Sequence, residues 1–70
     1  MKRVQTPITG TLRSYAVQPG DQVSVGQEVA IVESMKMMIP VLAEQGGKVR
    51  ALVHPLDQLV HEGDTLMELE

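Results

Sequence analysis

The chain has 70 residues, no cysteine and a net charge of −3, which excludes disulfides and thiolate metal sites and argues against a nucleic-acid-binding surface. One domain of this length, residues 1–70, buries only roughly 60% of the surface that its unfolded chain exposes, and without Phe or Trp its small core must be aliphatic. No apolar run is long enough for a membrane span or a signal peptide, so a cytoplasmic domain with no membrane partner is expected.

Short β-strands are predicted along the whole chain, because four prolines and six glycines leave no window long enough for a good helix. The first predicted strand covers residues 11–17 and ends at a turn at residues 19–21, where a Pro-Gly-Asp sequence favours chain reversal. Val23 and Val25 follow with the period of two that is typical of a strand. Residues 29–32 form a second, strongly β-prone run.

Another strand is predicted around Ile39, because Pro40 restricts the residue before it to extended geometry. Pro40 itself cannot donate a hydrogen bond, so this strand should lie at the edge of its sheet or direct that position outward. After a turn at residues 46–47, the last two predicted strands cover residues 48–53 and 65–69. The chain is therefore predicted to be all-β.

A repeat of 37 residues relates the two halves of the chain. When residues of about 1–35 are aligned with residues 37–70, matching glycines, aliphatic residues, arginines and glutamates fall into register without a gap. Neither half can bury an apolar face alone, so we expect two small antiparallel sheets that pack about a pseudo-twofold axis. The turn at residues 19–21 falls opposite Leu-Asp-Gln at 56–58, so this turn has different chemistry in the second copy.

The repeat places Lys36 at the junction between the two copies. Under a twofold relation, the termini should lie near one pole of the domain and Lys36 near the other. A lysine at a hairpin tip is ordinarily only a solvated charge. The residues around Lys36 decide whether it is interpreted as a solvated charge or as a reactive amine.

The motif Glu33-Ser34-Met35-Lys36-Met37 has a recognisable setting. It follows Gly26-Gln27-Glu28-Val29 and precedes Ile39-Pro40-Val41, Gly47-x-Val49 and Gly63-Asp64-x-Leu66. In these residues the chain resembles the biotinyl/lipoyl attachment domain family, and most closely the biotin carboxyl carrier domains and the small stand-alone attachment proteins. The resemblance implies a flattened β-barrel, or barrel-sandwich hybrid, of two four-stranded antiparallel sheets, with Lys36 at the tip of the hairpin between the fourth and fifth strands.

The resemblance also implies a function. A biotin protein ligase would acylate the ε-amine of Lys36 with biotin, and the carrier, monomeric and without catalysis of its own, would move carboxyl groups from a biotin carboxylase to a carboxyltransferase. Met35 and Met37 offer an adaptable apolar collar for the ligase, and Glu33 and Ser34 complete the motif. Lipoyl domains usually have Asp before the lysine and Ala after it, so biotin is favoured over lipoate as the cofactor.

Several alternatives remain open from the sequence. The chain could be a lipoyl carrier, or an unmodified β-barrel interaction module. Glu33 either orients the ligase or ends a strand, and Met38 stands where the family commonly has a polar residue. His54 and His61 have no third ligand placed by any pattern, so no metal site is expected. The starting methionine favours a stand-alone carrier.

Overall fold

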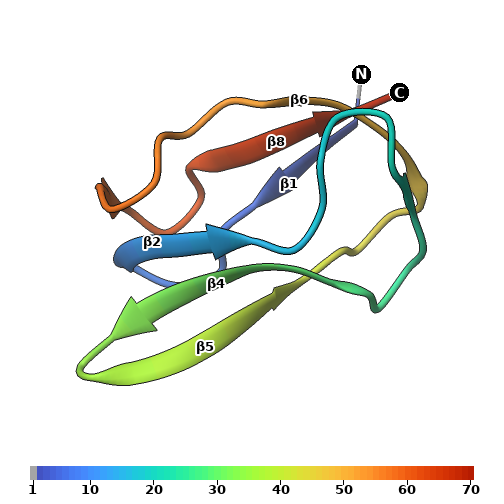
Figure 1. The fold of residues 1–70 in the computed structure, drawn as a ribbon. Coiled ribbons are helices and arrows are strands. Elements are labelled where there is room, and N and C mark those ends of the chain that lie inside the picture. The colour runs from blue at the N-terminus through green and yellow to red at the C-terminus, as the bar shows by residue number, and fades with distance from the viewer. Residues whose placement is uncertain (1) are drawn as a thin grey trace.

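The computed structural model describes residues 2–70, and Met1, which the sequence analysis includes in the first repeat, lies outside the described residues. The strands, in chain order, are β1 (Lys2–Gln5), β2 (Gly10–Tyr15), β3 (Gln22–Val23), β4 (Glu28–Ser34), β5 (Met37–Leu42), β6 (Gly47–Leu52), β7 (Leu59–Val60) and β8 (Thr65–Leu69). They form two four-stranded antiparallel sheets with the orders β1-β8-β6-β3 and β5-β4-β2-β7 (Figure 1). The predicted all-β fold of two four-stranded sheets is confirmed. Within residues 2–70, no helix is long and apolar enough to cross a bilayer.

The strand boundaries agree with the sequence pattern where the pattern is strong. The strand predicted at residues 65–69 is found with the same limits, and the hairpin between the fourth and fifth strands is present. Residues 16–17 lie outside β2, which ends at Tyr15. The prediction that Val25 continues a strand is wrong, because β3 ends at Val23 and Val25 lies in the following turn, 70% exposed.

Backbone hydrogen bonds in the loops show the pseudo-twofold directly. The amide of Gly26 donates to the carbonyl of Ala43 at 2.8 Å, and the amide of Gly63 donates to the carbonyl of Thr6 at 2.8 Å. Each residue of the first bond differs from its counterpart in the second by 37 positions. The two sheets obey the same relation, since a shift of 37 carries β1, β2, β3 and β4 onto β5, β6, β7 and β8.

The turn with different chemistry in the two copies nevertheless has the same backbone conformation. Gly20 has a φ of 98° and its counterpart Asp57 has a φ of 61°. The Gly20 amide donates to Val49 O at 2.8 Å, and the Asp57 amide donates to Leu12 O at 2.7 Å. Aspartate is among the few residues other than glycine that adopt a left-handed conformation readily. The repeat is therefore kept in geometry at a position where its sequence has diverged.

The core between the sheets is aliphatic, as the composition requires. Its buried members are Val4, Leu12, Val17, Val23, Val29, Ala30, Val32, Val41, Ala43, Val49, Val60, Leu66, Met67 and Leu69. Met67 is fully buried, which confirms that this methionine fills the core. Each fully buried side chain of this size stabilises the fold by about 1.5–3 kcal/mol relative to exposure.

Tyr15 departs from the symmetry near the core, because its counterpart is Leu52. The Tyr15 hydroxyl lies 2.8 Å from both His54 O and Leu66 O. Burial raises the pKa of this phenol above its usual 10.0, and the hydrogen bond from the His54 backbone partly offsets the effect. The side chain thereby ties the segment after β6 to the start of β8.

The start of β1 and the end of β8 lie at one end of the molecule, and the β4–β5 hairpin lies at the opposite end (Figure 1). The longest dimension of the molecule is 31 Å. This arrangement confirms the predicted placement of Lys36 at the pole away from the termini. β5 is the outermost strand of its sheet, as expected from Pro40. Along this hairpin, hydrogen-bonded and non-hydrogen-bonded pairs alternate, starting with a hydrogen-bonded pair at Ser34–Met37 beside the turn. The pair Ile31–Pro40 is therefore not hydrogen-bonded, and the proline nitrogen faces the open edge of the sheet. The missing N–H makes that edge a poor template for another strand.

Candidate functional site

The hairpin between β4 and β5 is closed by only two residues, Met35 and Lys36, with Ser34 and Met37 as the pair that flanks them. Met35 has a φ of 52° and Lys36 a φ of 65°. Two consecutive positive φ values are the signature of a type I′ turn, which usually contains Asn-Gly because other side chains are strained in the left-handed conformation. The expected hairpin is present, and its tip is a two-residue turn of residues that turn propensity alone would not select.

The side chains at the apex are open to solvent. Met35 is 92% exposed and Met37 is 62% exposed, with Lys36 exposed between them. Among the described residues, Lys36 takes part in no hydrogen bond or ion pair. The antiparallel ladder of β4 and β5 fixes its Cα, while the four-carbon stem and the amine are free to move. This is the geometry that an acylated, mobile side chain requires.

Glu33 and Ser34, the other two residues of the motif, are held in β4 and are only partly exposed. The Glu33 carboxylate lies 2.9 Å from the Nε of Arg13, and the Nη1 of the same arginine lies 3.0 Å from the Asp57 carboxylate. The charge of Glu33 is thus engaged within the fold. This supports the structural interpretation of Glu33, and the exposed part of the motif is limited to residues 35–37.

Arg13 is a residue of this region that the sequence analysis did not assign to the site. It links the end of β4 to the turn at Asp57 and so braces the base of the hairpin. A signal existed in the repeat, since Arg13 and Glu33 recur as Arg50 and Glu70. Ion pairs as exposed as these contribute about 0–1 kcal/mol each, so their main effect is on orientation.

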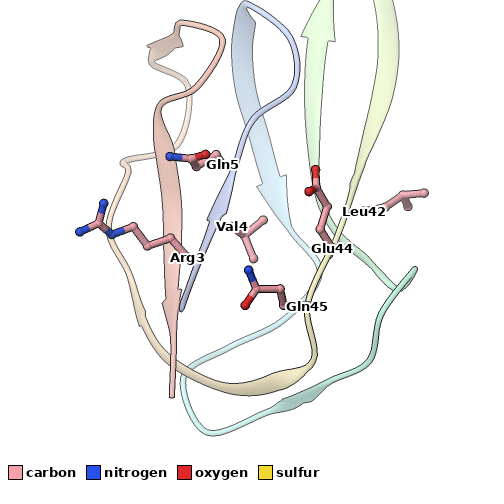
Figure 2. Close-up of a pocket in the computed structure, with 6 residues that line it drawn as sticks. All are labelled: Arg3, Val4, Gln5, Leu42, Glu44 and Gln45. Carbon is pink, nitrogen blue, oxygen red and sulfur yellow. The ribbon is translucent and has the colours of Figure 1, made fainter. Parts of the chain in front are cut away.

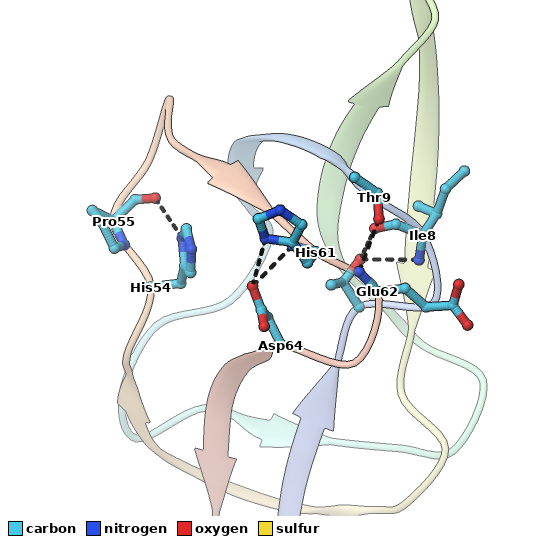
Figure 3. Close-up of polar contacts among 8 residues, drawn as sticks. Ile8, Thr9, His54, Pro55, His61, Glu62 and Asp64 are labelled. Atoms are coloured by element: carbon cyan, nitrogen blue, oxygen red, sulfur yellow. Dashed lines mark hydrogen bonds and ion pairs between the residues drawn. The ribbon is translucent and has the colours of Figure 1, made fainter.

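The two histidines lie apart from the hairpin and contact different partners (Figure 3). The His54 Nδ1 atom lies 2.9 Å from the carbonyl of Pro55, and the His61 Nδ1 atom lies 3.8 Å from the Asp64 carboxylate. Within residues 2–70, no three residues of the metal-binding types are grouped closely enough to hold an ion.

A small hollow lies between β1 and the segment that follows β5 (Figure 2). Its volume is about 100 Å³, and its lining includes Arg3, Gln5, Glu44 and Gln45. Ligand sites usually enclose about 300–1,000 Å³ and are mostly apolar, so this hollow is too small and too polar to be one. No residue of the motif lines it. The candidate functional feature among residues 2–70 is therefore the protruding hairpin and not this hollow.

Comparison with known proteins agrees with this geometry. Residues 2–69 match the biotin/lipoyl family model, which is described as "Biotin-requiring enzyme". The chain belongs to the biotin/lipoyl attachment family. It is 46% identical over 66 residues to the biotin/lipoyl attachment protein of Bacillus subtilis (strain 168), an alignment that covers 94% of this chain and 90% of that protein. The resemblance inferred from the residues is confirmed.

Larger members of the family contain the same domain as a small part. The chain is 37% identical over 67 residues to the mitochondrial propionyl-CoA carboxylase alpha chain of Homo sapiens, covering 96% of this chain and 9% of that protein. The urea carboxylase structure from Kluyveromyces lactis superposes with a TM-score of 0.89 at 29% identity, covering 99% of this chain and 6% of that one. A long-chain acyl-CoA carboxylase with a TM-score of 0.81 and 23% identity shares the fold. The chain thus spans less than a tenth of the length of these carboxylases.

Proposed function

We propose that the chain is a biotin carboxyl carrier, in which a biotin protein ligase acylates Lys36. The observation that carries the proposal is the two-residue turn that presents this lysine, without a partner among residues 2–70, between exposed Met35 and Met37. A ligase needs the amine itself inside its active site, and a narrow hairpin tip can enter where a broad surface cannot. The unbranched methionine side chains can adapt to the pocket that receives them.

The chain's own residues then act as an anchor. When the Lys36 nitrogen loses a proton and attacks the activated carboxyl carbon of biotin, an amide bond forms, the activating group leaves and the positive charge of the side chain is lost. Attached biotin supplies a ring that can accept and release a carboxyl group. The β4–β5 ladder holds the base of the arm, so the ring is present at high effective concentration in any active site that the arm reaches. Chemistry on the ring belongs to the partners, a biotin carboxylase and a carboxyltransferase.

Biotin is preferred to lipoate on two grounds. Met35 and Met37 flank the lysine, whereas lipoyl domains usually have Asp and Ala at these places. Several relatives are named as carboxylases, including propionyl-CoA and acetyl-CoA carboxylases. Lipoate stays the second candidate, because the attachment protein of Bacillus subtilis is named for both groups.

Intact mass of the chain made in cells supplied with biotin and lipoate tests the proposal. We expect a biotinyl increment and capture by streptavidin for the parent. Lys36→Arg should abolish both, and Lys48→Arg, which changes another exposed lysine in β6, should abolish neither. A lipoyl increment would favour the second candidate. An unmodified parent would contradict carrier function and favour an interaction module.

A further inference from the structure

The internal symmetry allows the outer faces of the two sheets to be compared position by position. We call β5-β4-β2-β7 the hairpin sheet, because it includes the β4–β5 hairpin, and β1-β8-β6-β3 the terminal sheet. Each outward position of one sheet has a counterpart 37 residues away in the other. Because the strands of the two sheets correspond, strand geometry alone does not explain a difference in polarity between the two faces.

One row of side chains crosses the outer face of the hairpin sheet next to the hairpin. Leu59, Thr11, Glu33 and Met38 are successive partners on its four strands. Leu59 is 58% exposed and Met38 is 60% exposed, so large apolar side chains stand at both ends of the row. A single long apolar residue on a surface needs no explanation, but a set that shares one face does.

The counterparts in the terminal sheet are polar or charged. Where the hairpin sheet has Leu59, Thr11, Ile31, Pro40 and Leu42, the terminal sheet has Gln22, Lys48, Glu68, Arg3 and Gln5. These counterparts are partners in the same way, since Gln22 pairs with Lys48 and Arg3 pairs with Glu68. Arg13 and Glu33 recur as the charged residues Arg50 and Glu70, Ser14 lies opposite Ala51, and the counterpart of Met38 is Met1, which lies outside the described residues. The terminal sheet presents a polar face, and the hairpin sheet presents a more apolar one that continues to the base of the Lys36 hairpin.

The outer face of the hairpin sheet carries a net negative charge. The guanidinium of Arg13 is shared between the carboxylates of Glu33 and Asp57. Glu28, the exposed partner of Leu42 at the far end of the face, adds a further negative charge. A surface that complements this face therefore offers apolar contacts to its leucines and Met38 and carries Lys or Arg near its carboxylates.

We propose that the outer face of the hairpin sheet is the docking surface for the enzyme that carboxylates the attached biotin, and this inference rests on the proposed function. The attached arm separates the reactive ring from the hairpin, so such an enzyme contacts the body of the carrier while the ring lies in its active site. A ligase instead must bring the Lys36 nitrogen itself to its active site and grips the tip. Recognition that extends along the strands, away from the tip, thus fits an enzyme that acts on the attached ring and does not fit the ligase.

The charges of the face disfavour a pairing of two copies through it. Two copies packed in this way would bring surfaces together that each carry a net negative charge from Glu28, Glu33 and Asp57 against Arg13.

The test exchanges residues between the two faces. Leu42→Gln with Leu59→Gln gives the hairpin face the residues of the terminal face, and Gln5→Ala with Gln22→Ala is the matched control on the terminal sheet. Both leucines are about half exposed, at 51% and 58%, so the variant should fold with an unchanged melting temperature. Each biotinylated protein is then assayed as the substrate of the biotin carboxylase of the same system, with the rate of loading by the ligase measured separately.

We expect the KM for the loaded hairpin-face variant to rise about tenfold, with kcat and the loading rate unchanged and the control pair like the parent. A KM within about twofold of the parent, or an equal rise in the control pair, would overturn the proposal. A parallel fall in loading would assign the face to the ligase, and self-association of the parent that the variant loses would assign it to a second copy. Either result would also overturn it. Absence of biotin on the parent, seen by streptavidin before any KM is measured, would instead refute the proposed function.

Discussion

The left-handed turn at the hairpin tip predicts that Lys36 lowers the stability of the domain. Lys36 has a φ of 65°, and this conformation costs a residue with a Cβ about 1–2 kcal/mol. Lys36→Gly removes that cost but adds about 0.5–1 kcal/mol from the greater freedom of glycine in the unfolded chain. The expected net effect is a gain of about 0.5–1 kcal/mol in the free energy of unfolding, together with complete loss of attachment.

Met37→Gly is the control one residue further on. Met37 lies in β5 and is not among the residues with positive φ, so glycine there relieves no strain and only adds freedom to the unfolded chain. We expect a loss of about 0.5–1 kcal/mol. For a domain of this size, a change of 1 kcal/mol shifts the melting temperature by about 4–8 °C, so the two variants should move in opposite directions by a measurable amount.

Thermal unfolding of the unmodified parent and both variants, followed by circular dichroism, measures these shifts. If Lys36→Gly lowered the melting temperature as much as Met37→Gly, the tip would not be strained and the type I′ assignment would be refuted. If the melting temperature rises as expected, the lysine is present for its amine at the expense of fold stability. Strain of this kind is typical of functional positions.

Three further predictions concern the scaffold. Gly26→Val and Gly63→Val should each lower the free energy of unfolding by about 1–2 kcal/mol, because both glycines have a positive φ that valine adopts only with backbone strain. No neighbouring atom would clash with the added Cβ, so backbone strain is the whole effect. Unchanged denaturation midpoints in both variants would contradict this prediction. Tyr15→Phe should lose about 1–2 kcal/mol near neutral pH. The pKa of Tyr15 is raised in the folded state, so the contribution of its hydroxyl to the free energy of unfolding is complete below pH 10.0 and is lost as the pH rises through the folded pKa. The difference in the free energy of unfolding between parent and variant, measured in urea, should therefore shrink at high pH. If Glu33 acts only through Arg13, Arg13→Gln and Glu33→Gln should slow biotinylation by the same modest factor, within about threefold. A larger loss of rate in the Glu33 variant alone would show that Glu33 contacts the ligase directly.

Sequence reasoning predicted those parts of the fold that depend on long apolar runs or on the repeat. Residues 29–32 lie within β4, and residues 65–69 coincide with β8. The edge position of the strand that contains Pro40 follows from the absence of an N–H group on proline. β3 and β7 contain two residues each, too few to show any periodicity. The error at Val25 has this origin, since two valines in alternation do not distinguish a strand from a strand end followed by a turn.

The candidate site was indicated by the sequence, but its conformation was not. Lys36 was singled out from its motif and its place at the junction of the copies, while its left-handed conformation contradicts turn propensity and depends on the flanking ladder. The ion pairs of Arg13 depend on a β-bulge, because the register between β2 and β4 shifts between Leu12 and Ser14. A bulge changes the direction of the side chain at that point, and no local pattern in the sequence specifies it.

The repeat explains why a domain this small can display a lysine on a two-residue turn. Two half-domains that pack about a twofold axis bring the end of one copy beside the start of the other at both poles of the molecule. In a single chain, the end of the first copy must be linked to the start of the second at one of these poles. At that pole the link between β4 and β5 closes a hairpin, while β1 begins and β8 ends at the other pole (Figure 1). The hairpin is thus the position where the symmetry of the scaffold is necessarily broken. The apolar outer face is the second break in that symmetry, and it adjoins the first. Function in this molecule is therefore to be sought where the two copies differ, because where they agree the residues serve the fold.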